Sequence, residues 1–264
     1  MKKSRDPVHD LDHVTRVAGY CETIAKNYIL TEKQKQALIL AAWWHDVSRT
    51  IPKRPSLFFM SLIDDTLSAL MLWMYTIRFG LFGSVAGMST RLIFCKSFGT
   101  GTLFTRLLLR KKNRILFEIL EDADTLDMLH VERTKQLLKL VETSALYRFG
   151  YKMAIHWFFA TKQINLKTEE AKKILIQLLR SFLIWVKQKD IFLWHEKFFS
   201  RHWITERIRD AEVFLQQPQT SFAIQRHTSR QSLSQIHYYG LHHTIAIFFL
   251  SRKMKTVYLY ILFN

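Results

Sequence analysis

The sequence has few cysteines, no convincing internal repeat and no stretch that alternates between apolar and polar residues as a half-buried strand does. Cys21 and Cys95 are the only cysteines, and both stand in apolar surroundings far apart. We therefore expect reduced thiols in the core rather than a disulfide. No signal peptide follows Met1-Lys2-Lys3, which predicts a cytoplasmic location.

Acidic residues are scarce relative to basic ones. The chain of 264 residues has 39 Lys and Arg against 22 Asp and Glu, a net charge of +17. Such a charge favours phosphates, nucleic acid or anionic lipid surfaces as partners and does not choose among them. With 48% apolar residues the chain has ample material for a sizeable core in one or two domains.

Apolar residues recur at helical spacing through most of the chain. Val14, Val17 and Cys21 belong to a predicted helix from about Asp12 to Tyr28. Thr31 and Gln34 form a capping box that begins a second helix, which runs to His45-Asp46. Further helices are expected at 106–120, 131–145, 168–187 and 205–216. The fold is predicted to be all-α, with a helical domain at 1–215 and a linker and basic, apolar C-terminal tail at 216–264.

Residues 66–90 form the longest weakly charged segment, with Arg78 as its one charge. The length suits a membrane span, but Arg78 lies near the middle and Gly80, Gly83 and Gly87 weaken a continuous helix. We therefore favour a buried helix-turn-helix, and a membrane is disfavoured as a partner.

Histidine and aspartate residues stand out against these apolar helices. The run before His45 and Asp46 is apolar, and two polar groups at its end are costly unless something compensates them. His13 begins the first helix, and Asp124 lies in a later one. Two histidines and two carboxylates from three helices can converge inside a bundle. Mixed nitrogen and oxygen ligands suit one divalent ion: Mn, Fe, Co, Ni, Zn or Mg.

The segments HVTRV, HD and DADTLD, in this order, resemble the HD-domain superfamily of metal-dependent phosphohydrolases. The resemblance covers roughly residues 9–215, and its specific motifs lie in 9–50 and 119–130. It implies an all-helical bundle and a metal set of His13, His45, Asp46 and Asp124. Asp127 is expected to support this set rather than join it.

Two absences refine what the resemblance implies. No histidine occurs between residues 47 and 123, whereas two-metal branches draw extra ligands from that interval, so one metal ion is expected. The acidic residues that follow His-Asp in some branches are also missing, which leaves the general acid or base open. The catalytic candidates are Asp46, Arg16 and His9. The substrate-binding candidates are Arg49, Lys53 and Arg54.

Three functions from different classes remain open at this point. The first is hydrolysis of a nucleotide or related phosphate ester, with a phosphate-containing small molecule as partner. The second is nucleic-acid binding, suggested by the net charge and the abundant aromatic residues, with an RNA-directed or degenerate site. The third is attachment to a membrane surface through 66–90 or the tail. In a degenerate relative, His13 would be an ordinary histidine, and Asp122 and Asp124 would only cap helices.

Overall fold

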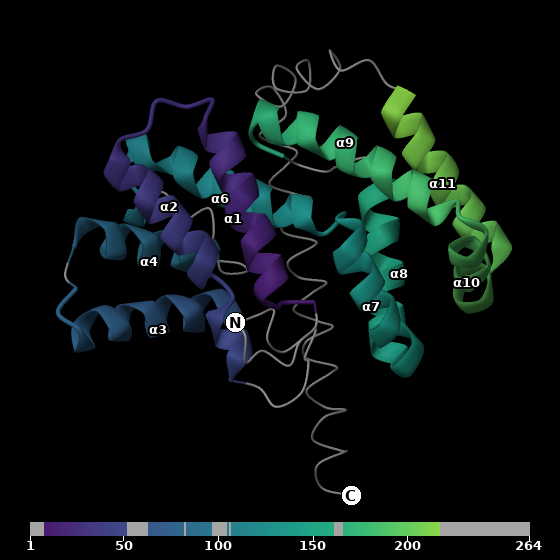
Figure 1. Cartoon of the computed structure of the whole chain (residues 1–264), viewed down its shortest axis with the longest axis horizontal. Coiled ribbons are helices and arrows are strands. Elements are labelled where there is room, and N and C mark those ends of the chain that lie inside the picture. The colour runs from purple at the N-terminus through teal and green to yellow at the C-terminus, as the bar shows by residue number, and fades with distance from the viewer. Residues whose placement is uncertain are drawn as a thin grey trace, which may run out of the picture. The chain divides into compact units, whose positions relative to one another are not determined.

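The computed structural model describes residues 8–51, 63–81, 83–96, 105, 107–160 and 166–216, without the side chains of 84 and 157–160. This described part is helical and contains no strand, which confirms the all-α prediction (Figure 1). Apart from Gln216, it belongs to one compact unit, Met1–Leu215. The predicted tail beyond Gln216 lies outside the described residues.

Three helices from distant parts of the sequence form the packing around the candidate centre. Helix α1 (Leu11–Ala25) contacts both α2 (Glu32–Trp44) and α6 (Arg114–Asp127), as Figure 1 shows. The predicted face of α1 is buried, with Val14, Val17 and Cys21 fully excluded from solvent. The capping box of Thr31 and Gln34 is present at the start of α2, and both cysteines are free and buried, as predicted.

The apolar segment forms a helix-turn-helix, as predicted. Helix α3 (Asp64–Arg78) ends at a turn in which Gly80 has a φ of 65° and the Leu81 N–H donates to the Thr76 carbonyl over 2.8 Å. Glycine suits this left-handed position because it has no Cβ. Helix α4 (Ser84–Lys96) then returns against α3 and α2. No described helix is both long and apolar enough to cross a membrane.

The second half of the described chain consists of further helices. They are α7 (Val131–Thr143), α8 (Ala145–Ala160), α9 (Glu169–Val186), α10 (Lys189–Phe199) and α11 (Arg201–Gln216). Helix α7 contacts α8 and α9, and α9 contacts α10. Helix α9 contacts α6 and so joins these helices to the first group. The sequence predicted α7, α9 and α11 approximately, whereas α8 and α10 were not predicted.

The predicted long helix at 106–120 is wrong in its extent. A 3-10 turn at Lys111–Asn113 precedes α6, which begins at Arg114 and continues through Asp127. The side chain of Gln34 stabilises this turn, because its Nε2 donates to Asn113 Oδ1 over 3.0 Å and to the Lys112 carbonyl over 3.3 Å. The basic residues that precede α6 therefore do not share one helix with its core residues.

Asp122 attaches the start of α9 to α6. Its carboxylate accepts hydrogen bonds from the backbone N–H groups of Lys167 and Thr168 and from the Thr168 hydroxyl, at 2.7–3.1 Å. Asp122 is almost fully buried, and Thr168 is the N-cap of α9. One carboxylate therefore satisfies donors that would otherwise be buried without partners.

Replacing the Asp122 carboxylate should lower the stability of the fold. We expect Asp122→Ala to lower the free energy of unfolding by about 2–3 kcal/mol, because two backbone N–H groups lose a charged acceptor. Urea unfolding followed by circular dichroism measures this change. Asp190→Ala, in the exposed first turn of α10, is the control and should cost less than about 0.5 kcal/mol. Equal effects of the two substitutions would contradict the assigned role of Asp122.

Candidate metal centre

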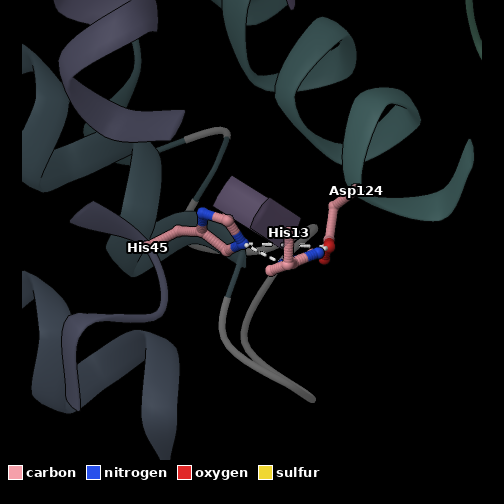
Figure 2. Close-up of side chains that lie close together, drawn as sticks. All are labelled: His13, His45 and Asp124. Carbon is pink, nitrogen blue, oxygen red and sulfur yellow. Dashed lines mark hydrogen bonds and ion pairs between the residues drawn. The ribbon is translucent and has the colours of Figure 1, made fainter. Parts of the chain in front are cut away.

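Histidine and aspartate side chains from three helices point toward one another in the interior. His13 lies in the first turn of α1, His45 is the C-cap of α2, and Asp124 lies in the last part of α6. Figure 2 shows these three side chains directed at a common point, and their ligand atoms lie within 4.8 Å of one another, close enough to hold a metal ion. Asp46, which follows His45, lies beside the two histidines, although it is not part of this three-residue group.

The distances between the donor atoms suit a single small ion. His13 Nε2 lies 3.2 Å from His45 Nε2, 3.1 Å from Asp46 Oδ2 and 3.5 Å from Asp124 Oδ1. His45 Nε2 lies 3.5 Å from Asp46 Oδ2 and 3.8 Å from Asp124 Oδ1. Donors about 2.1 Å from a common ion are about 3.0–3.4 Å apart in octahedral or tetrahedral geometry. The observed spacing needs only small movements to match.

The outer nitrogens of the two imidazoles have acceptors as partners. His13 Nδ1 lies 2.6 Å from Asp127 Oδ2, and His45 Nδ1 lies 2.7 Å from the Ala42 carbonyl. Because a carboxylate and a carbonyl only accept, both Nδ1 atoms donate, which directs the two Nε2 atoms at each other. Two unprotonated Nε2 atoms at 3.2 Å beside two carboxylates would repel one another, and either a proton or a metal ion between them removes this repulsion.

The electrostatics of the four groups lead to the same conclusion. Burial disfavours charge on His45, yet Asp46 and Asp124 outweigh it and raise the pKa of His45 to about 9. Burial disfavours charge on Asp46 as well, but His45 and His13 hold the pKa of this carboxyl well below its usual value. The site therefore favours anionic carboxylates around a positive centre. Two carboxylates and two neutral imidazoles balance the charge of a divalent ion.

Asp127 supports the centre from behind His13. Its carboxylate accepts a hydrogen bond from His13 Nδ1. It also accepts hydrogen bonds from Arg16 Nε at 2.5 Å and from Arg133 Nη1 at 3.3 Å. Burial alone would raise the pKa of Asp127, but His13 and Arg16 outweigh it and lower that pKa. Asp127 contacts a candidate ligand through the outer nitrogen of that ligand, which agrees with the supporting role predicted for it.

Lys96 and its partner Asp65 are residues at this site that sequence analysis missed. Lys96 Nζ lies 2.6 Å from Asp124 Oδ2 and 3.4 Å from Asp65 Oδ1, so it bridges α6 and the start of α3. Burial disfavours the ammonium, yet Asp124 and Asp65 hold its pKa well above the usual value. The only sequence signal was a lysine at the end of an apolar helix, the same pattern that drew attention to His45.

The remaining residues are the predicted catalytic and substrate-binding candidates, and each has different contacts. Arg16 lies beside the centre with its charge directed at Asp127, so it positions His13 indirectly. The ring of His9 is 5.6 Å from that of His13, and Arg133 Nη2 lies 3.1 Å from His9 Nε2. Arg49, a predicted substrate-binding residue, lies in a 3-10 turn at Val47–Thr50 and is buried in an ion pair with Asp64 at 2.5 Å. The remaining predicted positions, Lys53 and Arg54, lie outside the described residues.

Access to the centre is greatest on one side. The Asp124 side chain is 24% exposed, whereas those of His13, His45 and Asp46 are 0–6% exposed. Asp124 is therefore the most exposed of the four side chains. Lys96, which is 14% exposed, pairs with Asp124, and Asp65, which is 11% exposed, pairs with Lys96.

Comparison with models of protein families, with curated proteins and with solved structures finds no match to this chain.

Replacing a candidate ligand should abolish specific metal binding. We expect His45→Ala to weaken binding of Zn²⁺ or Mn²⁺ by more than about a hundredfold, and Asp127→Asn to weaken it about 10–100-fold by releasing the His13 ring. Isothermal titration of the chelator-treated protein measures both. His202→Ala removes an exposed histidine of α11 and is the matched control. Wild-type affinity in folded His45→Ala protein would exclude this metal centre, and Asp124→Asn provides a second, milder variant of the same test.

Proposed function

We propose that this protein is a metal-dependent phosphohydrolase of the HD type that acts on a nucleotide or a related phosphate ester. The observation that carries the proposal is the convergence of His13, His45 and Asp124, with Asp46 beside the two histidines. These residues come from the three sequence motifs that resemble this superfamily. A set of four donors leaves coordination positions for water and substrate, as a hydrolytic centre needs.

The ion would be held by the two Nε2 atoms and by one oxygen each of Asp46 and Asp124. When bound, a divalent ion lowers the pKa of water and polarises a phosphoryl oxygen. The chain itself supplies orientation, because Asp127 holds the His13 ring and Lys96 holds the carboxylate of Asp124. The Lys96 ammonium also lies on the accessible side, where it can stabilise negative charge on a phosphate oxygen.

Asp65 is the side chain that we assign to proton transfer. It lies at the start of α3, is buried, and is linked to Asp124 through Lys96. Burial raises its pKa to about 6, although Lys96 opposes the shift. A carboxylate with this pKa can accept a proton from water near neutral pH. Asp65 thus supplies an acidic group that the sequence lacks directly after His45-Asp46.

Hydrolysis should depend on the candidate ligands. Wild-type protein loaded with Mn²⁺ is expected to release phosphate from at least one member of a panel of nucleotides and other phosphate monoesters. Asp124→Ala should lower kcat/KM by about a thousandfold or more, because the ion and its activation of water are lost. Malachite green detection of phosphate measures the rate, and His202→Ala is again the control. The hydrolase proposal is wrong if folded, metal-loaded protein releases nothing from the panel.

The pH dependence should identify Asp65. Because the ionised carboxylate is the proton acceptor, kcat/KM should rise with pH through about 6 and then level off. Asp65→Asn should lack this rise and be about 10²–10⁴-fold slower, with metal affinity unchanged. Asp190→Asn, which removes an exposed carboxylate of α10, should keep the wild-type profile. An unchanged profile in Asp65→Asn would assign proton transfer to another group.

A further inference from the structure

Helix α3 has its large apolar side chains on the outside. Its buried positions are small or polar for the most part: Asp64, Asp65, Ser68, Ala69, Leu72 and Thr76. Its exposed positions include Leu70, Trp73, Met74 and Ile77, which recur at helical spacing and so share one side of the helix. A surface helix normally buries such a stripe. The prediction that this helix-turn-helix is buried is therefore wrong for the outer side of α3.

The exposed surface extends beyond this stripe. We define the α3 face as Leu70, Trp73, Met74 and Ile77, each of which is between 44% and 61% exposed. Tyr75 and Phe79 are also exposed but lie on another side of the helix. Their rings lie 4.5 Å apart, and Trp44 of α2 lies 5.3 Å from Tyr75. Contiguous apolar surface of this kind marks a site of contact with another phase or partner.

The charges around the α3 face are of one sign. Between residues 63 and 96 the only acidic residues are Asp64 and Asp65, and both are buried in ion pairs with Arg49 and Lys96. The exposed charges of α3 and α4 are Arg78, whose guanidinium lies 5.8 Å from the Phe79 ring, and Arg91. A second copy of the chain would bring like charges together. An anionic surface complements them, in keeping with the net charge of +17.

We propose that the α3 face docks on the surface of an anionic lipid bilayer, with α3 lying in the plane of the interface. Leucine, methionine and isoleucine side chains enter the acyl boundary in such a helix, while tryptophan favours the headgroup region. Arg78 can place its guanidinium among lipid phosphates while its stem stays on the apolar side. The same Arg78 that argues against a membrane span therefore suits a helix that lies on the membrane.

The test uses the full chain and sedimentation with lipid vesicles. We expect binding to phosphatidylcholine vesicles that contain phosphatidylglycerol, and markedly weaker binding to phosphatidylcholine alone or at high salt. Trp73→Glu with Ile77→Glu should weaken binding about a hundredfold, at roughly tenfold per side chain. Ile184→Glu with Leu193→Glu is the matched control, because both residues are exposed on α9 and α10 and the change in net charge is the same.

The possible results distinguish binding of the α3 face to a bilayer from its use as an interface between two copies of the chain. Retained binding in the Trp73 and Ile77 variant, or equal loss in the control, would overturn the proposal. So would a wild-type dimer that this variant dissociates without any vesicle binding, since the α3 face would then be an interface between copies. Circular dichroism and metal titration confirm that each variant is folded. The proposal stands or falls independently of hydrolysis, which is measured on the same proteins.

Discussion

The hydrogen bond between His13 Nδ1 and Asp127 is the interaction on which the candidate centre depends. It fixes the tautomer and the orientation of the ring, so that Nε2 faces the other donors. A fully buried carboxylate is costly, and Arg16 and Arg133 compensate it. Because these two residues lie in α1 and α7 and Asp127 ends α6, one carboxylate connects three helices behind the site.

Charge compensation extends from this carboxylate to the accessible side of the centre. Lys96 stabilises the Asp124 carboxylate and is itself stabilised by Asp65, while Arg49 pairs with Asp64 next to it. Each of these groups would be costly to bury alone, and together they neutralise one another. These ion pairs explain why the inner side of α3 is small and polar, because it includes the two buried aspartates Asp64 and Asp65.

Local sequence signals predicted the features that depend on neighbouring residues. The capping box of Thr31 and Gln34 and the buried face of α1 are confirmed, because the pattern that predicts each lies within a single helix. The break before α6 depends on Gln34, about 80 positions away, and so left no local signal. The convergence of His13, His45 and Asp124 was predicted from motif order, whereas Lys96 and Asp65 reach the site only through the packing of α3 and α4.

Helix α3 has two sides with different chemical surroundings. Its inner side positions Asp65 against Lys96, and its outer side carries Trp73 and Met74 into solvent. Any ligand of the outer side that tilts or shifts this rigid helix also displaces Asp65 relative to the donors of α1, α2 and α6. Linkage is reciprocal, so a ligand at the inner side that prefers one position of α3 changes the affinity of the outer side by the same factor. If α3 docks on a membrane and the centre hydrolyses a phosphate ester, as proposed, this one helix would couple the two events.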